Sequence, residues 1–215
     1  MKIGIIGSGI VSRVLGTAFL KEGYEVTLGT RNTSKEEVVK WKQENPKGIT
    51  GSFKDAAIFG DIIVLSVSGK AATEALQLAG IENLSGKTVI DTTNPIAAAP
   101  PVNGVLQYFT TYNESLMETL QASAPAAKFV KAFNSIGNVF MYKPDFGGIK
   151  PTMFICGNDT DAKKKVTTIL SAFGFETEDM GTVEAARAIE PLCMLWCIPG
   201  LTSNQWSHAF KLLKK

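Results

Sequence analysis

Hydrophobic residues along this chain gather in short, nearly continuous runs that do not alternate with polar residues. A strand of a parallel sheet has this composition, because helices cover both faces of the sheet. These apolar runs, some longer and some shorter, predict strands at residues 2–6, 24–29, 50–53, 62–67, 88–92, 128–133, 152–156 and 175–178.

Segments with a helical pattern separate these runs. They span residues 11–22, 35–45, 55–59, 71–78, 116–122, 160–173, 183–196 and 205–213. Repeated alternation of strands and helices predicts an α/β fold with a doubly wound, mostly parallel sheet of the NAD(P)-binding Rossmann type. We expect residues 1–215 to form a single domain. Within it, residues from about 180 to 215 are expected to form a small C-terminal helical extension that closes over the site.

Composition and charge narrow the class of protein. The 215 residues include 22 Lys and Arg and 20 Asp and Glu, a formal net charge of +2, which gives no electrostatic reason to expect a nucleic-acid partner. No apolar run reaches the roughly 18 residues of a membrane span, so we expect no membrane partner. Three cysteines and an opening without a signal-peptide pattern predict a cytoplasmic location. A homodimer is expected from general frequency alone.

A glycine-rich turn follows the first predicted strand, with the sequence Gly7-Ser8-Gly9-Ile10-Val11-Ser12. The first glycine allows a tight turn, and the second lets the backbone approach a pyrophosphate at the N-terminus of the next helix. Ser12 replaces the third glycine of the dinucleotide-binding fingerprint, at a position where a small residue is tolerated. The flanking strand and helix predict a dinucleotide site, and the alternative is a glycine turn without a ligand.

The end of the second predicted strand bears on the choice of dinucleotide. An NAD-specific site places Asp or Glu here to bind the ribose 2′-hydroxyl, whereas this chain has Thr30, Arg31 and Asn32, with Lys35 nearby. No carboxylate repels a 2′-phosphate, and Arg31 can bind one through a charge-assisted contact. The residues therefore predict NADP(H), and the alternative is that Arg31 is a solvated surface residue.

With these motifs in view, the chain resembles the NADP oxidoreductases that use the deazaflavin coenzyme F-420. It resembles more distantly the reductase domain of the six-transmembrane metalloreductases. The resemblance covers nearly the whole chain. The segments that carry it are residues 2–7, 29–31, 131–134 (Lys-Ala-Phe-Asn), 156–159 (Cys-Gly-Asn-Asp) and 188–192 (Ala-Ile-Glu-Pro-Leu).

The resemblance implies hydride transfer between NADP(H) and a small, flavin-like acceptor, either coenzyme F-420 or a flavin, stacked on the nicotinamide. Cofactor-binding residues are then expected in the glycine turn, at the second strand and after three later strands. They are Gly7, Ser8, Gly9, Ile10, Val11, Thr30, Arg31, Asn32, Lys35, Ser66, Val67, Ser68, Asn94, Pro95, Ala132 and Asn134. The expected acceptor-binding residues are Asn134, Ser135, Ile136, Leu192 and Trp196. The deazaflavin enzymes can carry a histidine at the place of Asn134, so the acceptor is a point where this chain departs from them.

Hydride transfer to such a ring depends on positioning and exclusion of water, so we predict no catalytic acid or base. We also predict no metal site, because Cys193 and Cys197 lie on an otherwise apolar helix. Glu190 is expected to pair with Arg187 or to cap a loop. Two other functions stay open. One is an NADPH-dependent reductase of a small carbonyl or imine, for which Lys70 and Lys131 are candidate acids, and the other is a non-catalytic NADPH-binding sensor.

Overall fold

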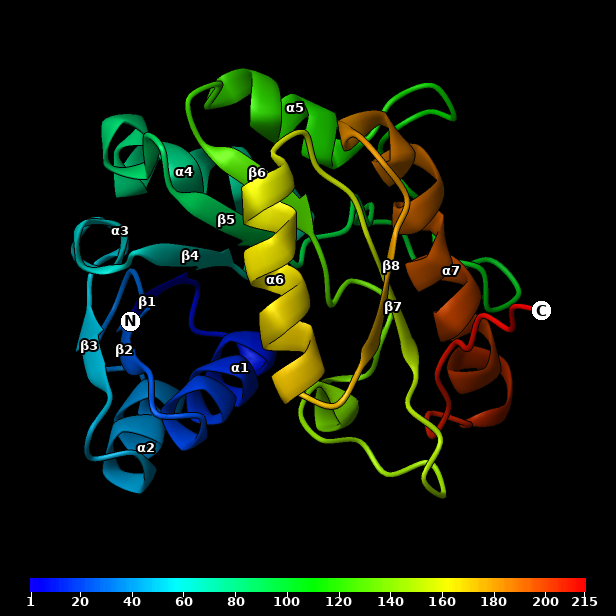
Figure 1. Cartoon of the computed structure of the whole chain (residues 1–215), viewed down its shortest axis with the longest axis horizontal. Coiled ribbons are helices and arrows are strands. Elements are labelled where there is room, and N and C mark those ends of the chain that lie inside the picture. The colour runs from blue at the N-terminus through cyan, green and yellow to red at the C-terminus, as the bar shows by residue number, and fades with distance from the viewer.

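The computed structural model describes all 215 residues, and its centre is a six-stranded sheet. The strands lie in the order β3-β2-β1-β4-β5-β6, and every neighbouring pair is parallel (Figure 1). Their bounds are β1 (Lys2–Ile6), β2 (Glu25–Gly29), β3 (Ile49–Gly51), β4 (Ile62–Leu65), β5 (Thr88–Asp91) and β6 (Lys128–Lys131). The predicted doubly wound, parallel α/β fold is confirmed.

Helices cover both faces of this sheet, which explains why its strands are apolar on both sides. They are α1 (Ile10–Lys21), α2 (Glu36–Glu44), α3 (Phe53–Phe59), α4 (Ala72–Ala79), α5 (Leu116–Ser123), α6 (Thr160–Ala172) and α7 (Ala186–Ser203). One buried cluster joins α1, α2 and α6 to one face of the sheet, and a second joins α3, α4, α5 and the start of α7 to the other face. The predicted helices from residue 11 to residue 196 are present, with ends shifted by a few residues.

The last two strands do not extend the main sheet. β7 (Thr152–Ile155) and β8 (Glu176–Asp179) form a separate parallel pair connected through α6. The chain leaves β7 past the end of β6, where the Lys131 N–H donates to the Cys156 carbonyl at 3.0 Å in an isolated antiparallel bridge. Because this bridge is antiparallel, β7 does not join the main sheet as a further parallel strand, and the parallel ladder ends at β6.

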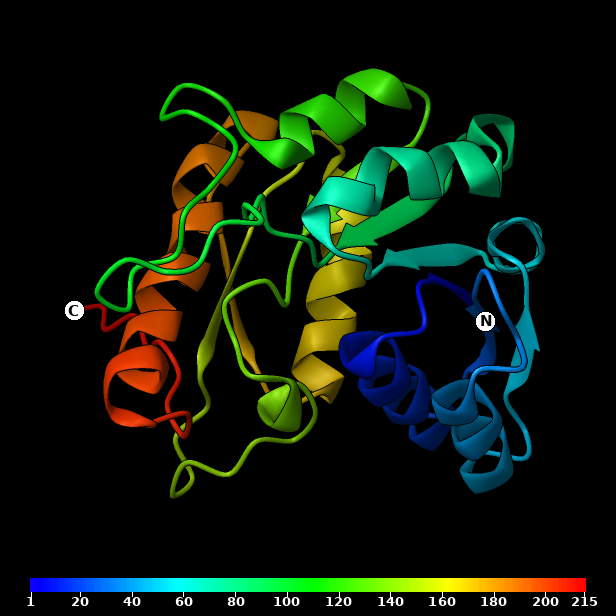
Figure 2. The same cartoon turned by 180° about the vertical axis from the view of Figure 1, so that it is seen from behind.

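The prediction of a helix over residues 205–213 is wrong. α7 ends at Ser203, and Asn204 adopts a left-handed conformation with φ 53° that stops the helix. The following residues are extended along the edge of β7, where Thr152 N–H donates to the Phe210 carbonyl at 2.9 Å and Leu212 N–H donates to Thr152 Oγ1 at 3.1 Å. Backbone pairing with this open strand edge replaces helical bonds, so the C-terminal extension is one helix followed by an extended segment (Figure 2).

α7 is the longest helix and carries few charges, but neither it nor any other helix has the length and hydropathy needed to span a membrane.

Candidate functional site

The glycine turn between β1 and α1 has the backbone that a dinucleotide loop requires. Gly7 has φ 134°, and a Cβ atom there would lie 2.3 Å from the Ser66 carbonyl oxygen, so no other residue fits without movement. Beside Gly9, by contrast, no atom lies within 4 Å of an added Cβ. The backbone at Gly9 is therefore open to close approach by a ligand.

The N-terminus of α1 opens at the same place. Gly9 is the N-cap residue, no side chain caps the helix, and its first turn holds no acidic residue. The first backbone N–H groups, including those of Ile10 and Val11, lack intrahelical acceptors by the geometry of a helix. These donors and the positive end of the helix dipole together favour an anion.

The side chains of Ser12 and Arg13 hold the glycine turn in place. Ser12 Oγ lies 2.7 Å from Ser66 Oγ and donates to the Ser66 carbonyl at 3.0 Å, so the residue that replaces the third glycine ties α1 to the end of β4. Arg13 Nη1 donates to the Ser8 carbonyl at 2.8 Å. No sequence motif predicted Arg13, whose only signal was a cation in the first turn after the glycine motif.

At the end of β2, Thr30 and Asn32 shape the loop. Thr30 is buried, and its hydroxyl accepts from Ser8 Oγ at 3.0 Å and from Asn32 N–H at 3.2 Å. Asn32 Oδ1 accepts from Ser34 N–H at 2.8 Å, which closes a turn. Many of the hydrogen-bonding groups of Thr30 and Asn32 are thus already paired within the protein.

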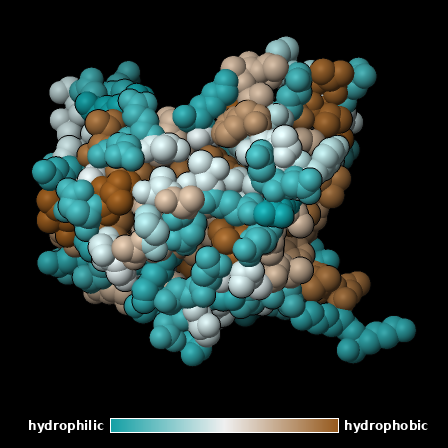
Figure 3. Space-filling view, turned by 90° about the horizontal axis from the view of Figure 1, so that it is seen from above, coloured by the Kyte–Doolittle hydropathy of each residue, from teal (hydrophilic) through white to brown (hydrophobic).

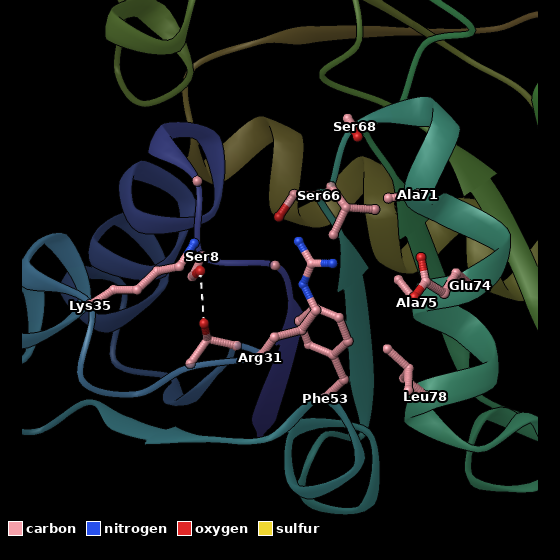
Figure 4. Close-up of a pocket in the computed structure, with 14 residues that line it drawn as sticks. Ser8, Arg31, Lys35, Phe53, Ser66, Ser68, Ala71, Glu74, Ala75 and Leu78 are labelled. Carbon is pink, nitrogen blue, oxygen red and sulfur yellow. Dashed lines mark hydrogen bonds between the residues drawn. The ribbon is translucent and has the colours of Figure 1, made fainter.

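Arg31 and Lys35 differ from these neighbours, because both are exposed and neither side chain forms a hydrogen bond or an ion pair with the protein. Figure 4 shows both side chains reaching into the space beside the glycine turn, with Lys35 directed towards Ser8. They are free cations next to the positive end of α1.

These residues line a cavity of about 210 Å³. One wall is polar and contains nine of the predicted cofactor residues, Gly7, Ser8, Gly9, Thr30, Arg31, Lys35, Ser66, Val67 and Ser68. The opposite wall comes from α3, α4 and the residue just before α4, and consists of Phe53, Ala71, Glu74, Ala75 and Leu78 (Figure 4). This second wall was not predicted from the sequence, because its apolar residues follow ordinary helix patterns and carry no motif. No residue of α7 lines the cavity, so the C-terminal extension does not cover this part of the site.

The predicted residues that follow β5 and β6 lie on the other side of β1 from Arg31, as the strand order requires. Asn94 Nδ2 donates to the Asn134 carbonyl at 2.8 Å, and Asn134 Nδ2 donates to Asn94 Oδ1 at 3.1 Å and to the Ile189 carbonyl at 2.9 Å. The Asn134 amide therefore joins the ends of both strands to α7, and both of its hydrogens are used in doing so. Pro95, Ala132, Ser135 and Ile136 are buried around this junction.

The turn after β6 is strained. Phe133 has φ 60°, a left-handed conformation that is rare for a bulky residue and costs on the order of 1 kcal/mol. Its ring packs edge-on to Phe175, with centroids 6.0 Å apart, which holds the residue in place. The packed core thus fixes the path of the backbone into Asn134.

A buried ionic cluster lies beneath the junction. Lys131 Nζ lies 2.6 Å from Asp91 Oδ2 and 2.9 Å from Glu190 Oε1, and it donates to the Thr93 carbonyl at 2.8 Å. The Lys131 side chain is fully buried. Burial alone would lower the pKa of Lys131, but the carboxylates of Asp91 and Glu190 outweigh it and the pKa is raised. Lys131 is therefore a charged structural group and not a proton donor to a ligand.

Glu190 has a second role within the cluster. Its two carboxylate oxygens accept from the N–H groups of Leu116 and Met117, each at 3.0 Å, so α7 caps the N-terminus of α5. The expected pairing of Glu190 with Arg187 is wrong, because Arg187 pairs with Glu118 on α5, and the segment that Glu190 caps is a helix and not the expected loop.

The predicted acceptor residues of α7 lie near the junction. The Trp196 indole contacts Gly137 after β6, where an added Cβ would lie 3.0 Å from the ring. The other sides of the indole pack against His208, stacked at 4.9 Å, and Trp206. Leu192 is half-buried. In Figure 3 the surface is hollowed between the side that carries α4 and the side that carries α7.

Comparison with known proteins places this arrangement in a family. The family model described as "NADP oxidoreductase coenzyme F420-dependent" matches residues 2–95, from β1 to the Asn94-Pro95 pair. A candidate F420-dependent NADP reductase from Arthrobacter sp. FB24 has a crystal structure that is 30% identical, with a TM-score of 0.92 and 100% of both chains covered.

Metalloreductases show a similarity that spans only part of their length. The chain is 30% identical to metalloreductase STEAP3 of Rattus norvegicus over 205 residues, which is 93% of this chain and 38% of the rat protein. It is 26% identical to human metalloreductase STEAP2 over 192 residues, 88% of this chain and 35% of that protein. The chain thus spans little more than a third of the curated relatives it matches.

An imine reductase from Streptomyces aurantiacus shares the fold alone, with 17% identity, a TM-score of 0.67 and coverage of 94% of this chain and 64% of that one. Full-length agreement at 30% identity with the Arthrobacter protein is decisive. The chain belongs to the coenzyme F420-dependent NADP oxidoreductase family.

Proposed function

We propose that this protein transfers a hydride between NADP(H) and a flavin-like acceptor, either the deazaflavin coenzyme F-420 or a flavin. The observation that carries the cofactor assignment is the pair of unpartnered cations, Arg31 and Lys35, beside an open glycine turn with no carboxylate at the end of β2. The names of the matching family and of the Arthrobacter protein support the acceptor class.

The residues of the cavity fit NADP(H) part by part. The open backbone at Gly9 and the N-terminus of α1 suit a pyrophosphate. Arg31 and Lys35 suit the 2′-phosphate, with Thr30 and Asn32 holding the loop that presents them. The apolar wall of Phe53, Ala75 and Leu78 suits one face of the adenine ring, whereas Ser66, Val67 and Ser68 would pass the cofactor towards β5.

The nicotinamide half would then meet the ends of β5 and β6. There Asn94, Pro95, Ala132 and Asn134 would bound the ring, and Ser135, Ile136, Leu192 and Trp196 would bound the acceptor. Because both Asn134 amide hydrogens are donated within the protein, Asn134 would act by fixing the backbone and not by donating to the acceptor.

NADPH, when bound, supplies the hydride. The protein is left to bind, orient and exclude water, which suits an acceptor ring that needs little acid–base help. The carbonyl or imine alternative relied on Lys70 or Lys131 as an acid. It loses one of these two candidates because Lys131 is fully buried between two carboxylates.

Anaerobic oxidation of NADPH, followed optically, tests this proposal. The purified protein is offered the deazaflavin coenzyme, FMN, FAD and riboflavin in separate reactions, with NADH in place of NADPH as the control. Turnover of NADPH with the deazaflavin or with a flavin would support the proposal and identify the acceptor. Tight NADPH binding without turnover by any of them would refute it in favour of a sensor.

A further inference from the structure

The buried cluster around Lys131 brings together segments that are far apart in the chain. One ammonium group is shared by the end of β5 through Asp91, by the following loop through the Thr93 carbonyl, and by α7 through Glu190. Lys131 itself is the last residue of β6. Four segments are therefore held by three polar contacts to a single atom.

Burying such a cluster in a core costs folding free energy. Each buried ion loses its hydration, and apolar residues of similar volume often stabilise a protein as well or better. Here two carboxylates face one ammonium, so the cluster also carries a net negative charge, balanced in part by the N–H groups of Leu116 and Met117 at the positive end of α5. What the cluster provides that an apolar core would not is a fixed direction and distance between its segments.

The same segments form the junction above the cluster. Asn94 follows Thr93 in the chain, Asn134 lies three residues after Lys131, and the Ile189 carbonyl that accepts from Asn134 immediately precedes Glu190. A movement of any segment in the cluster would thus separate the atoms of the Asn94–Asn134 amide pair. The Lys131 cluster and the Asn94–Asn134 amide pair therefore hold the same segments together at two adjacent levels.

We propose that Lys131 is the positioning residue for the nicotinamide half of the site. The proposal rests on the proposed function, since it takes the ends of β5 and β6 as the nicotinamide side. Lys131 acts through the backbone at Asn94 and Asn134 and touches no ligand. It therefore sets where the nicotinamide lies relative to the acceptor, without taking part in proton transfer.

The adenosine half is built independently, which makes the proposal testable. Every residue that lines its cavity lies between Gly7 and Leu78, and none of them contacts Lys131, Asp91 or Glu190 through a hydrogen bond or an ion pair. Adenosine 2′,5′-bisphosphate carries the adenine and the 2′-phosphate but no nicotinamide. It therefore reports on the adenosine half alone, whereas NADPH reports on both halves.

The experiment compares binding of these two ligands by calorimetry in the full chain. Lys131→Met should lower the affinity for NADPH by about tenfold and leave the affinity for the bisphosphate within about twofold of wild type. The hydride-transfer rate at saturating NADPH should fall by about 100-fold, as misplacement by about 1 Å does in other sites. Arg187→Ala is the matched control, because it removes an exposed α7–α5 ion pair that contacts neither strand end, and it should bind both ligands normally.

Lys131→Met leaves two buried carboxylates without their cation and could fail to fold. The double variant Lys131→Met/Asp91→Asn removes one charge of each sign, keeps an oxygen to accept from Thr93, and leaves Glu190 capping α5. It should show the same selective loss of NADPH affinity. A folded double variant that binds NADPH as wild type does, or that loses both ligands in proportion, would overturn the proposal. Wild-type protein that binds neither ligand would instead overturn the proposed function.

Discussion

At the end of β2, Arg31 and Lys35 are exposed and unpaired. At the ends of β5 and β6, by contrast, the Lys131 cluster is buried and paired within itself, and the Asn94 and Asn134 amides are hydrogen-bonded to each other. The first region has cationic side chains without a partner in the protein, which leaves them free to bind a ligand. The second has nearly all of its polar groups engaged, with Asn134 Oδ1 left without a hydrogen-bond partner, so it offers a ligand mainly a shaped surface. If the proposed function holds, one half of the site would recognise its ligand by charge and the other half by position.

The largest expected effect comes from breaking the buried half. Glu190→Ala should lower the free energy of unfolding by about 3–5 kcal/mol, because it leaves Lys131 with one carboxylate and leaves the α5 N-terminus uncapped. Urea denaturation monitored by circular dichroism measures this loss. A decrease below about 1 kcal/mol would mean that the buried network does not hold α7 in place.

The exposed half should lose binding without losing stability. Arg31→Ala should weaken NADPH binding by about 10- to 100-fold and change NADH binding little, because a charge-assisted contact to the 2′-phosphate is removed. Its melting temperature should match that of the wild type, since Arg31 has no partner in the protein. Titration of both cofactors measures the selectivity, and Lys40→Ala, a lysine of α2 in an exposed ion pair with Glu44, is the matched control. Equal losses for NADPH and NADH would refute the 2′-phosphate role.

The two glycines of the turn separate fold from binding at a single loop. Gly7→Ala forces a Cβ to 2.3 Å from the Ser66 carbonyl oxygen at φ 134°, and it should cost about 1–3 kcal/mol of unfolding free energy. Gly9→Ala meets no atom within 4 Å, at φ −68°, and should leave stability unchanged while weakening NADPH binding by about tenfold. Paired melting curves and titrations check both. A stable Gly9→Ala protein with wild-type affinity would show that the pyrophosphate does not approach this backbone.

The same contrast explains how far the sequence alone could lead. The fold and the charged half follow from local patterns, namely apolar runs, a glycine turn and Arg31 within a few residues of a strand end. Asp91, Lys131 and Glu190 lie up to about 100 residues apart, and each alone has the character of an ordinary surface charge. Only the fold brings them together, so their pairing could not be predicted. The resemblance singled out residues 131–134 and 188–192 without a physical reason, and the ion pair between Lys131 and Glu190 now supplies one.

The failed helix over residues 205–213 has a related cause. Its pattern of Trp206, Phe210 and Leu213 suits a helix locally, but the segment lies beside the unpaired edge of β7 and bonds to Thr152 there. Tertiary pairing overrides a weak local preference. The exposed edge could not be foreseen, because local sequence patterns do not show which strand edges stay unpaired.

The smallest expected effect tests whether surface charges on α7 behave differently from its buried one. The side-chain hydrogen bond from Arg187 lowers the pKa of Glu118, so this pair stabilises the fold above the ordinary pKa of Glu118 and ceases to do so as the pH falls through the lowered value. Arg187→Ala should therefore lower the melting temperature by about 1–2 °C at pH 7, and the difference from wild type should vanish in acid. High salt should reduce the same difference at pH 7, because the pair is exposed and screened.

The Lys131 cluster should show no such loss in acid on account of its lysine, whose raised pKa keeps the ammonium charged until the pH becomes strongly alkaline. Melting curves of Arg187→Ala and wild type at pH 7 and in acid, with and without salt, make the comparison. A difference that persisted unchanged in acid and in salt would mean that Arg187 acts through packing and not through its charge.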